Sequence, residues 1–162
     1  MWKGRSNIFT STQIKIWLES MQWHARNTYK IIQRLDRAWI ISPIRNGLYM
    51  KWTLVEWEDY YWEIIKKLTK IYAYGEWIIA WHSAASLYLW DYSLPEKLTI
   101  ITRNTNKVIT ISGKYQIHFR TIKQKNGKNI FPHLWSMRNP IEIQNIRVWI
   151  PSKEVALLEL LT

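Results

Sequence analysis

Apolar residues in the first forty positions recur at the spacing of two amphipathic helices. The first stripe has its members at i, i+3 and i+4: Ile14, Trp17 and Leu18. Thr10 or Ser11 can cap this helix, which we expect to begin near Gln13, after a short unstructured lead. Beyond a break near residues 20–23, a second stripe recurs every three residues: Tyr29, Ile32 and Leu35. The pattern therefore predicts two helices joined by a turn.

A hairpin signal follows the second predicted helix. Residues 38–50 contain two short β-prone runs, and Pro43 and the Asn46-Gly47 pair supply turn residues between them. A helix, a turn, a polar-faced helix and a hairpin, in this order, predict a winged helix-turn-helix in residues 1–53.

The outward face of the second helix is almost wholly basic or amide, which favours binding to double-stranded DNA. Such a helix fits the ~12 Å major groove, and the hairpin wing reaches the flanking phosphates. On the helix, the residues expected to contact DNA are Arg26, Asn27, Thr28, Lys30, Gln33, Arg34 and Arg37; on the wing they are Arg45 and Asn46. The alternative is that these are solvated positions of a winged-helix module that binds another protein.

The rest of the chain, residues 54–162, predicts a smaller α+β domain. A long helix over residues 54–73 has one apolar face and can end at Gly75. Its face consists of Tyr61, Ile64, Ile65, Leu68, Ile71 and Tyr72. A short strand over residues 77–80 and a short helix over residues 83–89 follow.

Three β-prone runs come next and predict an antiparallel meander. They occupy residues 98–102, 107–112 and 115–122, with turn residues between them. A further β-prone stretch covers residues 141–148, and Ser152 can cap a final helix that runs to Leu161. The fold class expected for the whole chain is α+β.

Charge supports a phosphate-binding function for the first domain. The net charge is +11, yet residues 1–53 carry nine Lys or Arg against two Asp or Glu, while residues 54–95 carry three against six. Lys and Arg release condensed counterions when they neutralise DNA phosphates. The absence of cysteine, of a ~18-residue apolar run and of a signal peptide leads us to expect a cytoplasmic protein with no membrane partner.

Candidate catalytic groups are weak. His82 and Ser83 are adjacent, so their side chains point apart on one turn, and no glycine elbow supports a nucleophile with Asp91. The four histidines lack the spacing of metal ligands. We therefore expect neither an enzyme, a metal nor a cofactor.

Five segments carry a resemblance to a known family: residues 35–41 (LDRAWII), 44–49 (IRNGLY), 80–90 (AWHSAASLYLW), 94–97 (LPEK) and 147–158 (RVWIPSKEVALL). Their order resembles the AbiEi family of antitoxins from type IV toxin–antitoxin systems. The resemblance spans most of the chain, and each segment alone is only moderately specific.

The resemblance implies a winged helix that binds operator DNA and represses its own operon, as a dimer if the operator is an inverted repeat. It also implies a carboxy-terminal domain that counteracts a nucleotidyltransferase-like toxin without a catalytic site. Members of this family usually continue beyond the position of Thr162. An alternative expectation is therefore that the second domain is truncated at its carboxy-terminal end. The alternative function is a protein-interaction antitoxin with weak or no DNA binding.

Tryptophan is unusually frequent, with 12 Trp against 5 Gly, although glycine averages ~7% of residues. Trp39, Trp81 and Trp90 stand where the resembling family has glycine. Trp39 and Trp90 also fall at expected helix ends, where a left-handed backbone favours glycine. We hypothesise that many of these codons are UGA codons that the organism reads as glycine. The alternative is a genuinely Trp-rich, AT-biased or engineered sequence. A role of the rings in stacking on bases is disfavoured, because these tryptophans are scattered over both domains.

Overall fold

In the computed structural model of the protein, the described residues are 7–21, 27–51, 57–88, 94–123 and 126–158. The chain divides into two compact units, residues 1–56 (unit 1) and 57–162 (unit 2). The boundary expected after residue 53 falls within residues 52–56, outside the described residues. Each unit contains both helices and strands, so the fold is α+β.

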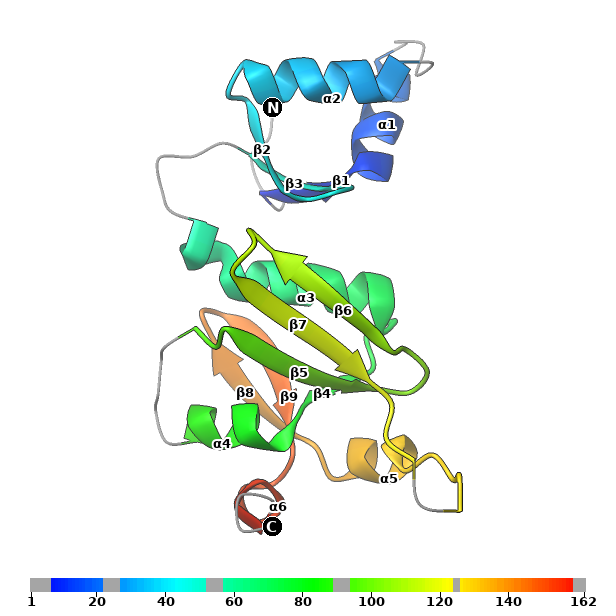
Figure 1. Cartoon of the computed structure of the whole chain (residues 1–162), viewed down its shortest axis with the longest axis vertical. Coiled ribbons are helices and arrows are strands. Elements are labelled where there is room, and N and C mark those ends of the chain that lie inside the picture. The colour runs from blue at the N-terminus through cyan, green and yellow to red at the C-terminus, as the bar shows by residue number, and fades with distance from the viewer. Residues whose placement is uncertain (1–6, 22–26, 52–56, 89–93, 124–125, 159–162) are drawn as a thin grey trace. The chain divides into compact units, whose positions relative to one another are not determined.

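Unit 1 contains β1 (Ile8–Thr10), α1 (Ser11–Ser20), α2 (Thr28–Arg37), β2 (Ile41–Arg45) and β3 (Leu48–Lys51) (Figure 1). Thr10 begins α1 with a capping box, in which its hydroxyl accepts from the Gln13 N–H and the Gln13 side chain accepts from the Thr10 N–H. The predicted cap is confirmed. The unstructured lead is wrong, because Ile8 and Phe9 are buried and pair with β3.

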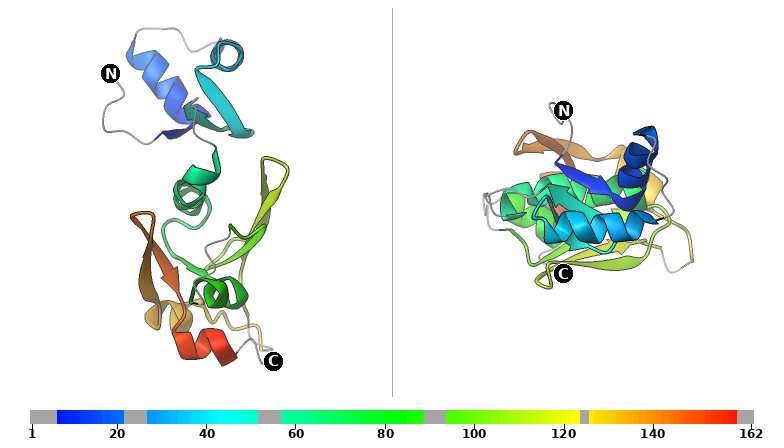
Figure 2. Two further views of the ribbon diagram at one scale, coloured as in Figure 1. Left: turned by 90° about the vertical axis from the view of Figure 1, so that its left-hand side faces the viewer. Right: turned by 90° about the horizontal axis from the view of Figure 1, so that it is seen from above.

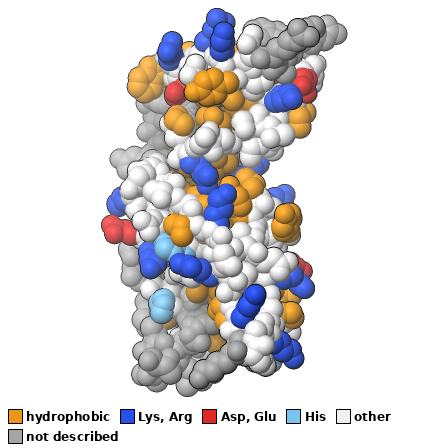
Figure 3. Space-filling model, turned by 45° about the vertical axis from the view of Figure 1, so that its right-hand side comes forward, with side chains coloured by type: hydrophobic (Ala, Val, Ile, Leu, Met, Phe, Trp, Pro, Cys, Tyr) orange, Lys and Arg blue, Asp and Glu red, His pale blue; other side chains and the backbone are white. Residues whose placement is uncertain are grey.

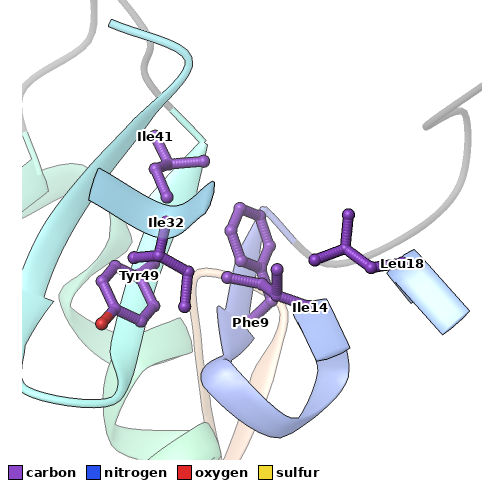
Figure 4. Close-up of a cluster of buried hydrophobic side chains, with 6 residues drawn as sticks. All are labelled: Phe9, Ile14, Leu18, Ile32, Ile41 and Tyr49. Atoms are coloured by element: carbon purple, nitrogen blue, oxygen red, sulfur yellow. The ribbon is translucent and has the colours of Figure 1, made fainter. Parts of the chain in front are cut away.

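One hydrophobic cluster holds α1, α2 and the strands of unit 1 together. Its buried members are Phe9, Ile14, Leu18, Ile32, Ile41 and Tyr49 (Figure 4). Ile31 and Leu35 pack against this cluster beside Ile32. The expected burial of Tyr29 is wrong, since its side chain is 69% exposed. The buried stripe of α2 therefore runs along Ile31, Ile32 and Leu35, with Tyr29 on the other side of the helix.

The predicted hairpin is confirmed as the antiparallel pair β2–β3, joined at Asn46 and Gly47. Gly47 has φ +79°, a left-handed value that glycine adopts without a Cβ clash. Pro43 lies within β2 rather than in the turn. The sheet order β1-β3-β2 makes β2 an edge strand, where a residue without an N–H is tolerated.

Trp39 ends α2 in a Schellman motif. The Trp39 N–H bonds the Asp36 carbonyl at 3.0 Å, and the Ile40 N–H bonds the Leu35 carbonyl at 2.9 Å. Trp39 itself has φ +55° and is 71% exposed. The expected left-handed backbone at position 39 is confirmed; Trp90 lies outside the described residues. A bulky side chain thus occupies a backbone position that favours glycine.

We expect Trp39→Gly to stabilise the protein by about 1 kcal/mol, because a left-handed backbone costs an L-residue roughly 1–2 kcal/mol. Urea unfolding followed by far-UV circular dichroism measures the change. Trp39→Ala is the matched control, since alanine keeps the Cβ and removes only the ring. Equal stability of the glycine and alanine variants would contradict the backbone argument.

Mass spectrometry of the protein from its own organism tests the hypothesis that UGA codons are read as glycine. Tryptophan at position 39 in that protein would refute the hypothesis at this position.

Unit 2 contains a 3-10 turn, η2 (Trp57–Tyr60), followed by α3 (Tyr61–Tyr72), β4 (Trp77–Ile79), α4 (Trp81–Tyr88), β5 (Lys97–Thr102), β6 (Lys107–Ile111), β7 (Tyr115–Arg120), α5 (Phe131–Ser136), β8 (Asn139–Ile143), β9 (Ile146–Ile150) and α6 (Lys153–Leu158). The predicted helix over residues 54–73 is thus α3 preceded by η2. Ile71, expected on its apolar face, is 39% exposed. Among the described residues, none of the helices has both the length and the apolar character needed to cross a membrane.

The expected meander is wrong, because β5 pairs with β7 and the two run parallel. The sheet order is β4-β5-β7-β6, with β6 at an edge. Burial explains this order: Leu98, Ile100 and Ile101 are fully buried on both faces of β5, as expected of a central strand. In β6, by contrast, exposed Val108 and Thr110 alternate with buried Ile109.

The helix α3 covers one face of the four-stranded sheet. Tyr61 and Tyr115 make an edge contact, Tyr72 and Phe119 a tilted one, with ring centroids 5.6 Å apart in each pair. The Tyr61 hydroxyl donates to the Pro95 carbonyl at 3.2 Å. In Figures 1 and 2, the β8–β9 hairpin lies on the same side of this sheet as α3. The opposite face of the sheet is consequently not covered by α3.

Two features near the end of the chain differ from expectation. The β-prone stretch is a complete hairpin, with Gln144 and Asn145 both at positive φ in its turn. The helix α5 was not predicted, and its Phe131 is fully buried. The predicted cap of the last helix is confirmed, since the Ser152 hydroxyl accepts from the Val155 N–H at 3.4 Å.

Candidate nucleic-acid interface

The exposed side of α2 carries four of the nine residues that were predicted to contact DNA. Lys30, Gln33, Arg34 and Arg37 are all exposed. Their spacing places them on one side of the helix, opposite the stripe that packs on the hydrophobic cluster. Figure 3 shows Lys and Arg side chains gathered over α2. Four of the predicted residues are therefore brought together on one helix face.

The cations of this face are available to an external anion. Within the described ranges, the ion pairs are Lys15 with Glu19 and Arg103 with Glu76. Lys30, Arg34 and Arg37 belong to neither pair. The one acidic residue on the outer side of α2 is Asp36. Three of these charges thus face solvent without a carboxylate partner in the described part of the chain.

The amino-terminal end of α2 presents the next predicted residues. Asn27 is the N-cap and is exposed, and its side chain makes no capping hydrogen bond. An amide that does not cap its own helix has donors and an acceptor left for a ligand. Thr28 is half-buried in the first turn. Arg26 lies outside the described residues.

The hairpin holds the two remaining predicted residues. Arg45 is half-buried at the end of β2, and Asn46 is exposed in the turn. The Ser11 N–H at the start of α1 donates to the Gly47 carbonyl at 3.1 Å. This bond ties the hairpin turn to the helical part of unit 1. The turn therefore has a defined position relative to the capped end of α1.

Tyr29 is a candidate contact that the sequence pattern misassigned. Its ring is exposed. Tyr29 lies on the same side of α2 as Gln33, which follows it by one helical turn. An aromatic ring in the major groove can contact the methyl group of thymine. The sequence contains the correct apolar stripe, which is Ile31, Ile32 and Leu35 at i, i+1 and i+4. This stripe fits one side of a helix better than Tyr29, Ile32 and Leu35, which are spaced every three residues.

In unit 2, the groups considered for catalysis do not assemble into a described site. His82 and Ser83 both lie in the first turn of α4, and Asp91 is outside the described residues. Among the residues that the structure describes, no three His, Asp or Glu side chains are placed to hold a metal ion. The exposed basic face of α2 is thus the best-defined site for the predicted chemistry.

No family model matches the chain, and no curated protein matches it.

Proposed function

We propose that unit 1 is a winged helix-turn-helix that binds double-stranded operator DNA, and that the protein is a repressor and antitoxin of a type IV toxin–antitoxin system. In this proposal α2 is the recognition helix and the β2–β3 hairpin is the wing. Unit 2 counteracts a nucleotidyltransferase-like toxin. The sequence resemblance to the AbiEi family is the basis for the toxin and for repression of the protein's own operon.

The observation that carries the DNA-binding proposal is the basic face of α2, which is exposed and forms no ion pair within the described ranges of the chain. A recognition helix needs an apolar side that fixes it to its domain and an outer side that donates to phosphates and base edges. Ile32 supplies the first, because it is buried in the cluster of unit 1. Lys30 and Arg34 supply the second, four residues apart on the outer side.

The individual roles follow from side-chain chemistry. Arg34 can bind a guanine through two donors, whereas Lys30 acts as a point charge toward phosphate or guanine. Gln33 can pair with adenine through its amide. We assign Arg45, which is half-buried at the end of β2, to a phosphate or the minor groove. Operator binding as a dimer would repeat these contacts on the two halves of an inverted repeat.

We expect the double variant Lys30→Ala/Arg34→Ala to bind the DNA upstream of its own gene at least about tenfold more weakly, since one lost base-edge contact alone costs ~1–3 kcal/mol. Each lost phosphate contact should also reduce the slope of log K against log salt by about 0.9. Fluorescence anisotropy at several salt concentrations measures both quantities.

The matched control is Lys66→Ala/Lys70→Ala, which removes two cations from α3. Its affinity and salt slope should stay close to those of the wild-type protein if α2 is the contact surface. Equal losses in both double variants would mean that net charge, and not the α2 face, drives binding. Unchanged affinity in the α2 variant would contradict the proposal.

The antitoxin part of the proposal is tested by co-expression of the full chain with the neighbouring gene product. We expect the Lys30→Ala/Arg34→Ala variant to rescue growth as well as the wild-type protein does, while it no longer represses a reporter driven by its own promoter. Rescue by a wild-type protein that fails to repress the reporter would favour the alternative, a protein-interaction antitoxin with weak or no DNA binding. Absence of rescue by either protein would contradict the antitoxin assignment.

A further inference from the structure

Unit 2 contains a cavity of about 240 Å³ between α4 and the start of β5. The described residues that line it are polar apart from one proline: His82, Ser83, Ser86, Pro95, Lys97 and Thr99. Ligand pockets for drug-sized molecules are usually ~300–1,000 Å³. A cavity of this smaller size suits a compact group, and the lining indicates a group that accepts hydrogen bonds.

The strand register places more polar side chains on the same face of the sheet. In the parallel pair, Lys97 lies opposite Gln116, and Thr99 lies opposite His118. Side chains alternate between faces along a strand, so these four project to one face. The intervening Leu98 and its neighbour Ile117 project to the other face, toward α3. The polar face and the cavity are therefore continuous at Lys97 and Thr99.

Positive charge gathers around this face. His118 is 9% exposed, and its Nε2 lies 3.1 Å from the Gln116 side-chain oxygen. Burial lowers the pKa of His118, and the positive charges of Lys97 and Arg120 lower it further. Both cations thus act on the same ring. Figure 3 likewise shows His beside Lys and Arg side chains on unit 2.

The cavity holds donors that the described part of the protein leaves unused. Lys97 belongs to neither ion pair found among the described residues. The hydroxyls of Ser83 and Thr99 make no hydrogen bond to another described residue, whereas the Ser86 hydroxyl donates to the His82 carbonyl at 3.1 Å. Among the residues that the structure describes, no carboxylate lines the cavity. The nearby Glu96 instead acts electrostatically on Lys114.

We propose that this cavity binds a phosphate group. Lys97 pairs with its negative charge, and the hydroxyls of Ser83 and Thr99 donate hydrogen bonds to its oxygens. Arg120 adds positive potential from the adjoining sheet face. The ligand is either free phosphate or the phosphate end of a nucleotide, because both present the same oxygen acceptors. This site is separate from the DNA-binding face of α2, so each proposal can fail without the other.

Calorimetric titration of the full chain with inorganic phosphate, and in parallel with ATP, tests the site. We expect saturable binding of at least one of them, weakened about tenfold or more by Lys97→Gln, because hydrogen bonds to charged groups are the stronger class. Ser83→Ala and Thr99→Val should each weaken it less. Lys70→Gln, which removes an exposed lysine of α3, is the matched control and should bind normally.

The His118 ring gives a local readout by NMR. A bound phosphate should raise the pKa of His118, because a nearby anion stabilises the imidazolium. Lys30→Ala should leave this shift intact, since Lys30 belongs to unit 1. Tighter binding of phosphate than of ATP would identify the free ion as the ligand, and the reverse would identify a nucleotide. Absence of saturable binding of either, or equal affinity in Lys97→Gln and the wild-type protein, would overturn the proposal.

Discussion

The burial of Ile32 in the hydrophobic cluster of unit 1 fixes the rotation of α2 about its own axis. Ile31 and Leu35 pack against the same cluster, so the helix has one inner side. Every residue half a turn away must then face solvent. Lys30, Gln33 and Arg34 owe their exposure to this constraint, and no local interaction of their own is needed to hold them outward. A small apolar contact thereby sets the electrostatic character of the domain surface.

Local signals in the sequence were sufficient for most of unit 1. The Thr10 cap, the two helices and the Asn46-Gly47 hairpin each depend on neighbouring residues, and the structure has all of them. The assignment of Tyr29 to the core failed because an aromatic residue at a three-residue spacing looks apolar in any pattern. Whether such a ring is buried depends on the neighbours it meets in space, which a single stripe does not specify.

Strand pairing in unit 2 shows a different limit. The turn residues correctly marked where the three strands end, but they do not determine which strands become neighbours. Strand β7 lies between β5 and β6, so β5 has a partner on each side, as its fully buried Leu98, Ile100 and Ile101 require of a central strand. The same pairing aligns Thr99 with His118 and creates the polar face beside the cavity. A meander would have separated these residues, so the proposed phosphate site was not visible in the sequence.

The central claim is that the outer side of α2, together with the β2–β3 hairpin turn, meets DNA. Titration of the 15N-labelled protein with the duplex upstream of its gene, followed residue by residue by NMR, tests it most directly. The account predicts the largest amide shifts over residues 29–37 and 45–47, with small shifts at the exposed Ile16 of α1 and throughout β5–β7. Shifts concentrated in unit 2, or spread evenly over exposed lysines, would contradict it.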